Sequence, residues 1–238
     1  MSSLWKRVTA AHVQFVTTGY LRLMEPIAGL LIRIGISANA LTTLGTLFTV
    51  IGGVAYASGH MRVGGWIIGI TAIADALDGI VARRTGQVTV FGAFYDSTLD
   101  RIGDGALLAG IAYFYATSPI YGSLPMLGVS LAGIIGTFMV SYARARAESL
   151  GINAKVGVMQ RAERVILLCA PQALFGLALD GWVLRVVVVI LTVTAWHTAV
   201  LRINYVRHST LVAQQPPLRV MSEKPIPVEG KSSRRAKS

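Results

Sequence analysis

Residues 75–100 read DALDGIVARRTGQVTVFGAFYDSTLD, and this stretch places four aspartates between long apolar segments. The chain has 238 residues, of which 53% are hydrophobic and 14% are charged, whereas a soluble domain usually carries about 25% charged residues. Residues 40–58 and 123–141 contain no charged side chain, and each stretch is long enough to cross a hydrocarbon core of roughly 30 Å as a helix. The composition therefore predicts an integral membrane protein.

The pattern of apolar stretches predicts an all-α fold with six transmembrane helices. The expected spans cover residues 38–58, 63–83, 90–116, 122–146, 163–179 and 182–203. Residues 1–33 mix apolar and basic side chains, which is typical of an amphipathic helix in the membrane interface, and Pro26 marks a break in it. Residues 34–207 would form the six-helix transmembrane domain. Residues 208–238 are rich in proline and basic residues, so we expect a disordered cytoplasmic tail there.

The distribution of basic residues predicts the orientation in the membrane. Arg83 and Arg84 follow the second expected span, whereas residues 117–122, on the other side, contain no basic residue. The positive-inside rule then places both termini in the cytoplasm of a multi-pass protein of the cell membrane. The formal net charge is +11, but basic and aromatic residues do not alternate as in a nucleic-acid groove. We therefore expect anionic lipid headgroups, and no nucleic acid, as partners of the basic residues.

Five of the eleven acidic residues fall in the second and third expected spans. These are Asp75, Asp78, Asp96, Asp100 and Asp104. The i, i+3 and i, i+4, i+8 spacings place each group on one helix face, and the short connection of residues 84–90 predicts that the two helices are antiparallel neighbours. Carboxylates near a bilayer core need compensating positive charge. Converging carboxylate oxygens suit Mg²⁺ or Mn²⁺, so the spacing predicts a divalent metal site near the cytoplasmic end.

Glycine and arginine residues interleave with these acids. Gly79, Arg83, Thr89 and Gly92 give close backbone approach and a guanidinium group beside the carboxylates, an arrangement suited to phosphate oxygens that bridge to a metal. Metal, arginine and glycine together indicate a pyrophosphate site. The alternative is a polar packing seam, in which salt bridges with Arg83 or Arg101 neutralise the acids.

The arrangement Asp75-x-x-Asp78-Gly79-x-x-Ala82-Arg83, eight further residues, and then Gly92-x-x-x-Asp96-x-x-x-Asp100 resembles the complete motif of the CDP-alcohol phosphatidyltransferase family. The resemblance implies two metal ions per site, held by Asp75, Asp78, Asp96 and Asp100. It also implies that Asp100 is the general base on the attacking hydroxyl, and that Gly79, Arg83 and Thr89 lie near the CDP group. The resemblance further implies a homodimer with one site in each protomer, as is typical of the family.

A second segment similar to the family lies at the start of the first expected span. Ser37, Ala38, Asn39 and Ala40 stand where the family approaches the cytidine nucleotide, with Ala38 in place of the commoner proline. Ser37 also has the residue type of a helix N-cap. The resemblance implies that these four residues bind the CDP-lipid.

Arginine residues near the cytoplasmic ends of the last three expected spans bear on the acceptor alcohol. The runs around Ser141 and Arg144, and around Arg164, resemble those that bind inositol phosphate in phosphatidylinositol-phosphate synthases, although Arg144 replaces a common lysine. The resemblance implies that Ser141, Arg144, Arg164 and Arg202 hold the phosphate of a small phosphorylated alcohol. The alternative for each arginine is snorkelling to lipid headgroups.

The resulting functional prediction is transfer of a phosphatidyl group from CDP-diacylglycerol, or an ether-lipid analogue, to inositol phosphate, with release of CMP. Glycerol 3-phosphate or serine as the acceptor is the nearest alternative. A divalent-cation transporter and a noncatalytic lipid-binding scaffold are alternatives from other classes, because aspartates in a membrane also line ion paths.

Overall fold

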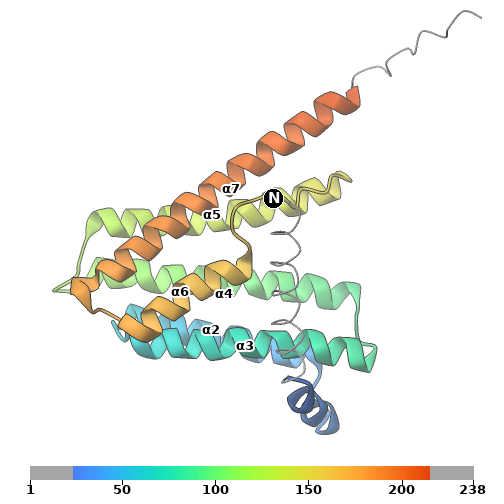
Figure 1. Ribbon diagram of the computed structural model, residues 1–238, viewed down its shortest axis with the longest axis horizontal. Helices are drawn as coiled ribbons and strands as arrows, with labels where there is room; N and C mark the ends of the chain where they lie inside the picture. The colour runs from blue at the N-terminus through green and yellow to red at the C-terminus, as the bar shows by residue number, and fades with distance from the viewer. Residues whose placement is uncertain (1–23, 215–238) are drawn as a thin grey trace, which may run out of the picture.

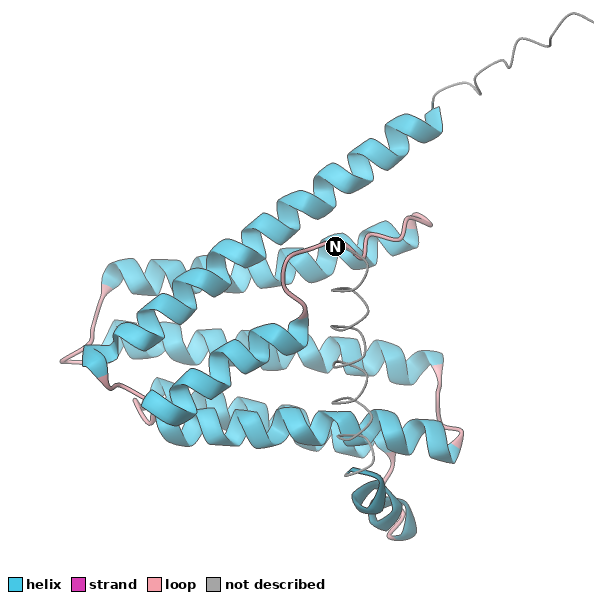
Figure 2. Ribbon diagram, viewed as in Figure 1, coloured by secondary structure: helices cyan, strands magenta, loops and turns pink. Residues whose placement is uncertain are grey.

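The computed structural model describes residues 24–214 and, over this part of the chain, consists of helices joined by short connections without any strand (Figures 1 and 2). Residues 24–33 are helical. The helices that follow are α2 (Ala38–Ala57), α3 (Met61–Thr85), α4 (Val90–Thr117), α5 (Leu124–Ser149), α6 (Arg161–Phe175), the 3₁₀ turn η1 (Leu179–Gly181) and α7 (Trp182–Gln214).

Hydroxyl side chains begin three of the long helices. Ser37, Thr89 and Ser123 have extended backbone angles, and each accepts a hydrogen bond from a backbone N–H in the first turn of α2, α4 and α5 respectively. Such caps satisfy N–H groups that have no partner within the helix. Helix α3 ends at Gly86, whose left-handed backbone (φ 68°) turns the chain toward α4. The predicted cap at Ser37 is thus confirmed.

Helix α2 is the central element on the acidic side of the molecule. It packs against both α3 and α4, while α3 also packs on α6, and α5 packs between α4 and α7. Helices α2 and α4 approach closely at Gly53 and Gly110, where a Cβ atom at Gly110 would lie 2.1 Å from the Gly53 carbonyl oxygen. Helices α3 and α4 run in opposite directions (Figure 1), as predicted, and Asp75 of α3 lines one cavity with Asp96 and Asp100 of α4. Their close helix packing, however, is with α2, which lies against both.

Helices occur at all six expected positions, and four of the described helical segments are long and apolar enough to cross a membrane. They are Ala38–Ala57, Met61–Thr85, Leu124–Ser149 and Leu179–Leu211. Large apolar side chains on these helices, such as Phe48, Trp66 and Ile70, are more than half exposed, which is the expected state of a helix face in contact with lipid. Among the described helices, α4 interrupts its apolar run with charged residues, and α6 has 15 residues.

Two helix boundaries differ from the sequence prediction. The fifth expected span, 163–179, is the shorter helix Arg161–Phe175, which ends at Gly176. The last helix continues past residue 203 to Gln214, so residues 208–214 are helical and not part of a disordered tail. The residues before 24 and after 214, which include most of the predicted interfacial helix and tail, lie outside the described part.

The start of α6 determines the shape of the half of the bundle that contains the acidic residues. Residues 150–160 fold back from the end of α5, and α6 begins about midway along α4 (Figure 1). The backbone N–H of Gln160 donates to Glu163 Oε2 over 2.9 Å, which fixes the first turn of α6 at this depth. A short α6 therefore leaves room beside α4, α5 and α7.

Candidate active site

Helix α2 positions the two aspartates of α3. Thr42 Oγ1 donates a hydrogen bond of 2.9 Å to Asp78 Oδ2. Gly45 leaves space for Asp75, because a Cβ atom at position 45 would lie 2.8 Å from Asp75 Oδ1. Any larger residue at position 45 would displace the carboxylate, so the glycine holds a place for Asp75 within the helix packing.

A small cavity of about 10 Å³ lies where the acidic faces of α3 and α4 meet. Its lining consists of Asp75, Asp96, Asp100, Arg161, Thr42, Thr46, Thr49, Leu99 and Gly103. This volume is comparable to the space that holds one buried water molecule. Carboxylates from two helices that are distant in sequence therefore surround one enclosed point.

Arg161, at the start of α6, supplies positive charge to these carboxylates. Its guanidinium nitrogens lie 2.8 Å from Asp100 Oδ1, 3.7 Å from Asp75 Oδ2 and 3.6 Å from Asp104 Oδ1. Arg101 adds a longer contact of 3.5 Å to Asp100 Oδ2. Salt bridges thus do neutralise part of the acidic cluster, as the alternative interpretation of the sequence expected. Arg161 is the main partner, whereas Arg83 takes no part in the ion pairs of the described residues.

The donor set of this cavity fits a hard divalent cation. Asp75, Asp96 and Asp100 offer carboxylate oxygens and the threonines of α2 offer hydroxyl oxygens, the ligands that Mg²⁺ and Mn²⁺ prefer. Asp78 does not line the cavity and is held by Thr42. Within the described chain, no three acidic, histidine or cysteine side chains are arranged closely enough to hold a metal ion. The four-carboxylate convergence predicted from the spacing is therefore only partly present.

The segments predicted to contact the nucleotide meet at the beginnings of α2 and α4. Ser37 Oγ accepts a hydrogen bond from the Ala40 N–H over 3.3 Å. Asn39 reaches the first turn of α4, since a Cβ atom at Gly92 would lie 3.6 Å from Asn39 Oδ1. Ala38 is buried against the end of α3, so its methyl group is a packing contact.

Two further residues of this group flank the same region. Thr89 Oγ1 accepts a hydrogen bond of 2.9 Å from the Gly92 N–H. The Arg83 guanidinium lies over Gly79, where an added Cβ atom would be 3.2 Å from Arg83 Nη1. Because Gly79 has no side chain, the Arg83 side chain can lie close to the surface of α3. The eight predicted residues belong to α2, α3 and α4 or to their N-caps. Helices α3 and α4 both pack on α2.

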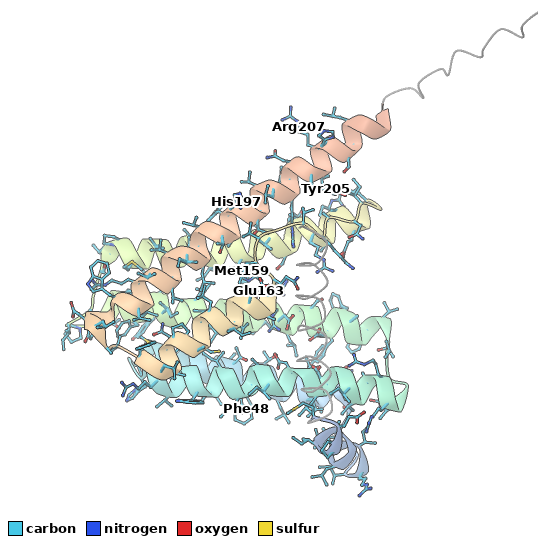
Figure 3. All side chains as sticks on the ribbon, in the orientation of Figure 1. Phe48, Met159, Glu163, His197, Tyr205 and Arg207 are labelled. Carbon is cyan, nitrogen blue, oxygen red and sulfur yellow. The ribbon has the colours of Figure 1, made fainter. Side chains whose placement is uncertain are left out.

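A large cavity of about 1310 Å³ lies beside the acidic site, between α4, α5, α6, α7 and the connection that precedes α6. Met159 and Glu163 mark the start of α6 in Figure 3. The charged side chains in the lining are Asp96, Asp100, Arg101, Arg144, Glu148, Lys155, Arg161, Arg164 and Arg202. Basic groups outnumber acidic ones, so the cavity favours an anionic occupant.

All four residues predicted to hold the acceptor phosphate line this large cavity. Ser141 donates to the Thr137 carbonyl and accepts from Arg101. Arg144 pairs with Glu148 one turn further along α5, with a distance of 2.9 Å. The structure therefore brings Ser141 and Arg144 to the cavity with their local partners on α4 and α5.

The other two predicted residues also carry structural contacts. Arg164 is buried and lies 3.6 Å from Asp104. Arg202 donates from Nε to the Val156 carbonyl over 2.9 Å and from Nη1 to the Val140 carbonyl over 2.6 Å. Arg202 thus ties the connection before α6 to α5 and α7, and it supports the cavity wall as well as facing the cavity.

Sequence reasoning missed several residues of the site. Arg161 was visible in the run before Arg164, but nothing in the spacing indicates that it reaches the aspartates. Thr42, Thr46 and Thr49 recur on one face of α2, and this i, i+4, i+7 pattern of hydroxyl groups inside an apolar span is a signal that could have identified the face opposite the acids.

Comparisons with known proteins identify the family of the chain. Residues 35–196 match the family model described as CDP-alcohol phosphatidyltransferase. The chain belongs to the CDP-alcohol phosphatidyltransferase family, and it is accordingly a phosphatidyltransferase of phospholipid biosynthesis. The enzyme class is therefore favoured over the transporter and the scaffold that the sequence analysis left open.

Individual relatives give a finer comparison. The chain is 37% identical over 185 residues to archaetidylinositol phosphate synthase of Methanothermobacter thermautotrophicus, which covers 78% of this chain and 89% of the relative. It is 34% identical over 164 residues to phosphatidylinositol phosphate synthase of Cutibacterium acnes, which covers 68% of this chain and 78% of the relative.

Solved structures of phosphatidylinositol phosphate synthase from Mycobacterium tuberculosis share this fold. The structure with CDP-DAG bound has a TM-score of 0.72 and 31% identity, and covers 78% of this chain and 94% of that one. The complex with manganese and citrate has a TM-score of 0.71 and 31% identity, and covers 76% of this chain and 88% of that one.

Proposed function

We propose that this enzyme transfers a phosphatidyl group from CDP-diacylglycerol, or from an ether-lipid analogue, to inositol phosphate and releases CMP. The observation that carries the proposal is the large cavity in which Asp96 and Asp100 share one space with a surplus of basic side chains. A phosphorylated polyol satisfies both halves of such a cavity, because its phosphate binds to the arginines while a hydroxyl faces the carboxylates. The names of the synthases to which the chain is similar support the same acceptor.

The proposed metal site comprises Asp75, Asp78, Asp96 and Asp100 and holds two Mg²⁺ or Mn²⁺ ions. Support comes from the oxygen donors around the small cavity and from the manganese in a similar structure. Metal ions bound there would stabilise the pyrophosphate charge of the CDP-lipid and the departing CMP. Thr42 donates a hydrogen bond to Asp78 Oδ2, and the other carboxylate oxygen of Asp78 would be the ligand to the metal.

Asp100 is the proposed general base. Its carboxylate lines both cavities, and its side chain is 18% exposed. A base must reach the hydroxyl proton and remain close to the metal-bound phosphate, so the boundary between the two cavities is the suitable position. The proton of the acceptor hydroxyl passes to Asp100 as the hydroxyl oxygen attacks the lipid phosphate.

The proposed donor site lies at the ends of α2, α3 and α4. It comprises Ser37, Ala38, Asn39, Ala40, Gly79, Arg83, Thr89 and Gly92. The proximity of Asn39 to Gly92 supports a common nucleotide site there, and Arg83 is free of ion pairs with the described residues and thus available for the phosphates. The acceptor phosphate is assigned to Ser141, Arg144, Arg164 and Arg202, with Arg202 also holding the cavity wall.

The proposed membrane arrangement has six spans, an interfacial helix at the N-terminus, and an active site that faces the cytoplasm of the cell membrane. Helices at all six positions and the exposed apolar faces support it. The helix of residues 24–33 packs on the end of α3, and Glu25 pairs with Arg84 over 2.7 Å. A homodimer is proposed from the family resemblance.

The test is CMP release from CDP-diacylglycerol by the purified enzyme with Mg²⁺ and a panel of acceptors. The panel contains inositol 1-phosphate, inositol, glycerol 3-phosphate and serine. We expect the highest kcat/KM with inositol 1-phosphate and little activity with unphosphorylated inositol. Comparable activity with inositol and inositol 1-phosphate would contradict a phosphate pocket, and a preference for glycerol 3-phosphate would keep the pocket but change the acceptor.

A further inference from the structure

Arg161 stands at the boundary between the two cavities. Its side chain lines the small acidic cavity and also the large basic one, as do Asp96 and Asp100. The capping hydrogen bond between Glu163 and Gln160 places Arg161 at the first position of α6. A long cationic side chain at this position reaches carboxylates on one side and open space on the other.

The contacts of Arg161 with the acids satisfy its charge but not all of its hydrogen-bonding capacity. Three aspartates lie within 3.7 Å of the guanidinium group. The Nε atom, however, is buried and has no hydrogen-bond partner. A buried donor without a partner costs free energy that an alternative position could recover. Ion pairs therefore hold Arg161 beside the aspartates, but its incomplete hydrogen bonding favours a move to another position.

The neighbouring Arg164 shows the contrast. Arg164 lies one turn further along α6, its side chain is 10% exposed, and its partner Asp104 is also buried. The side chain of Arg161 is 31% exposed. Both arginines line the large cavity, but Arg164 is the more deeply buried of the two, whereas the more exposed Arg161 has more free volume into which it can turn.

We propose that Arg161 is an exchangeable counter-cation that competes with the divalent metal for Asp75 and Asp100 and, when displaced, binds the acceptor phosphate. This inference rests on the proposed function, because it requires both the metal site and a phosphorylated acceptor. A divalent ion and a guanidinium group at the same oxygens repel each other. The large cavity is the place where the displaced arginine meets a complementary anion.

The consequence is a positive coupling between metal and acceptor. The acceptor phosphate holds Arg161 away from the carboxylates and so strengthens metal binding, and by thermodynamic linkage the metal strengthens acceptor binding by the same factor. The carboxylates are then available to the metal chiefly when the acceptor is present.

The test is a titration of the purified full-length enzyme in detergent with Mn²⁺, with free Mn²⁺ measured by its electron paramagnetic resonance signal. We expect Arg161→Gln to bind Mn²⁺ at least about fivefold more tightly than wild type without acceptor. Inositol 1-phosphate should tighten Mn²⁺ binding in wild type and have a much smaller effect in Arg161→Gln. An unchanged or weaker Mn²⁺ affinity in the variant would overturn the proposal.

Three controls separate this inference from other effects. Arg146→Gln removes the same charge from α5 at a residue that does not line either cavity, and should bind Mn²⁺ like wild type. Arg161→Lys keeps the competing charge and should remain close to wild type. Asp75→Asn should lose Mn²⁺ affinity; if it does not, the proposed metal site fails, whatever Arg161 does. Should Arg161→Gln not fold, absence of the acceptor effect in wild type still overturns the proposal.

Discussion

Asp100 is proposed both as a metal ligand and as the general base. It faces both cavities and has Arg161 and Arg101 as cationic neighbours. Two guanidinium groups offset part of the cost of placing this carboxylate in apolar surroundings, where an unpaired charge would be costly. The same two arginines also fix the position of the carboxylate at the boundary between the two cavities.

We predict that Asp100→Asn lowers kcat at least about 100-fold, because the amide cannot accept the proton of the acceptor hydroxyl. Binding of CDP-diacylglycerol should be largely retained. The measurements are CMP release and equilibrium binding of the labelled lipid. Asp180→Asn, in the η1 turn, is the matched control and should keep wild-type activity. Activity of Asp100→Asn close to wild type would exclude the general-base role.

Arg164 and Asp104 form a buried pair whose loss should affect stability. Arg164→Gln leaves Asp104 with Arg161 as its remaining cationic partner, at 3.6 Å, and should cost about 3 kcal/mol, toward the low end for a broken buried pair. Asp104→Asn in the same chain should recover part of that loss. Thermal unfolding in detergent measures both. Additive losses in the double variant would show that the two side chains are not coupled.

Among the helices, the close contact of α2 with α4 sets the spacing of the acidic faces. We predict that Gly110→Ala destabilises the protein and lowers activity, since its Cβ atom would meet the Gly53 carbonyl oxygen at 2.1 Å and force the helices apart. The matched control is Gly128→Ala on α5, where nothing lies within 4 Å of an added Cβ atom. Thermal unfolding and CMP release should change only for Gly110→Ala.

The sequence predicted the helices well because apolar length and helix caps are local properties. Long uncharged stretches and cap residues such as Ser37 are visible without tertiary structure. The packing order was not predictable in this way: α2 lies against both acidic helices, although the short connection between α3 and α4 suggested direct contact. Helix order depends on close approaches such as that of Gly53 with Gly110, which join residues far apart in sequence.

The same distinction applies to the site. The spacing of Asp96 and Asp100 places both on one helix face, and the structure has both at the cavities. Arg161 reaches the acids because α6 begins midway along α4, and this depth depends on how residues 150–160 fold back. No periodicity encodes that depth, so the main counter-cation of the site could not be found from the sequence.

For the whole molecule, the two ends of the helix bundle should face opposite aqueous compartments. We predict that Gln87→Cys, in the connection between α3 and α4, reacts with an impermeant maleimide only from the cytoplasmic side. Thr117→Cys, at the other end of α4, should react only from outside. Cys169 is buried and should give little background. Labelling of both positions from the same side would contradict the proposed topology.

The late start of α6 has a consequence for how the enzyme treats solvent. A cavity of about 1310 Å³ that is lined by Asp100 is large enough to admit water as well as a phosphorylated polyol. Water, which is far more concentrated, therefore competes with the acceptor hydroxyl as a nucleophile toward the donor lipid. Selectivity for the proposed acceptor over water would then depend on the basic side chains of this cavity, which favour an anion.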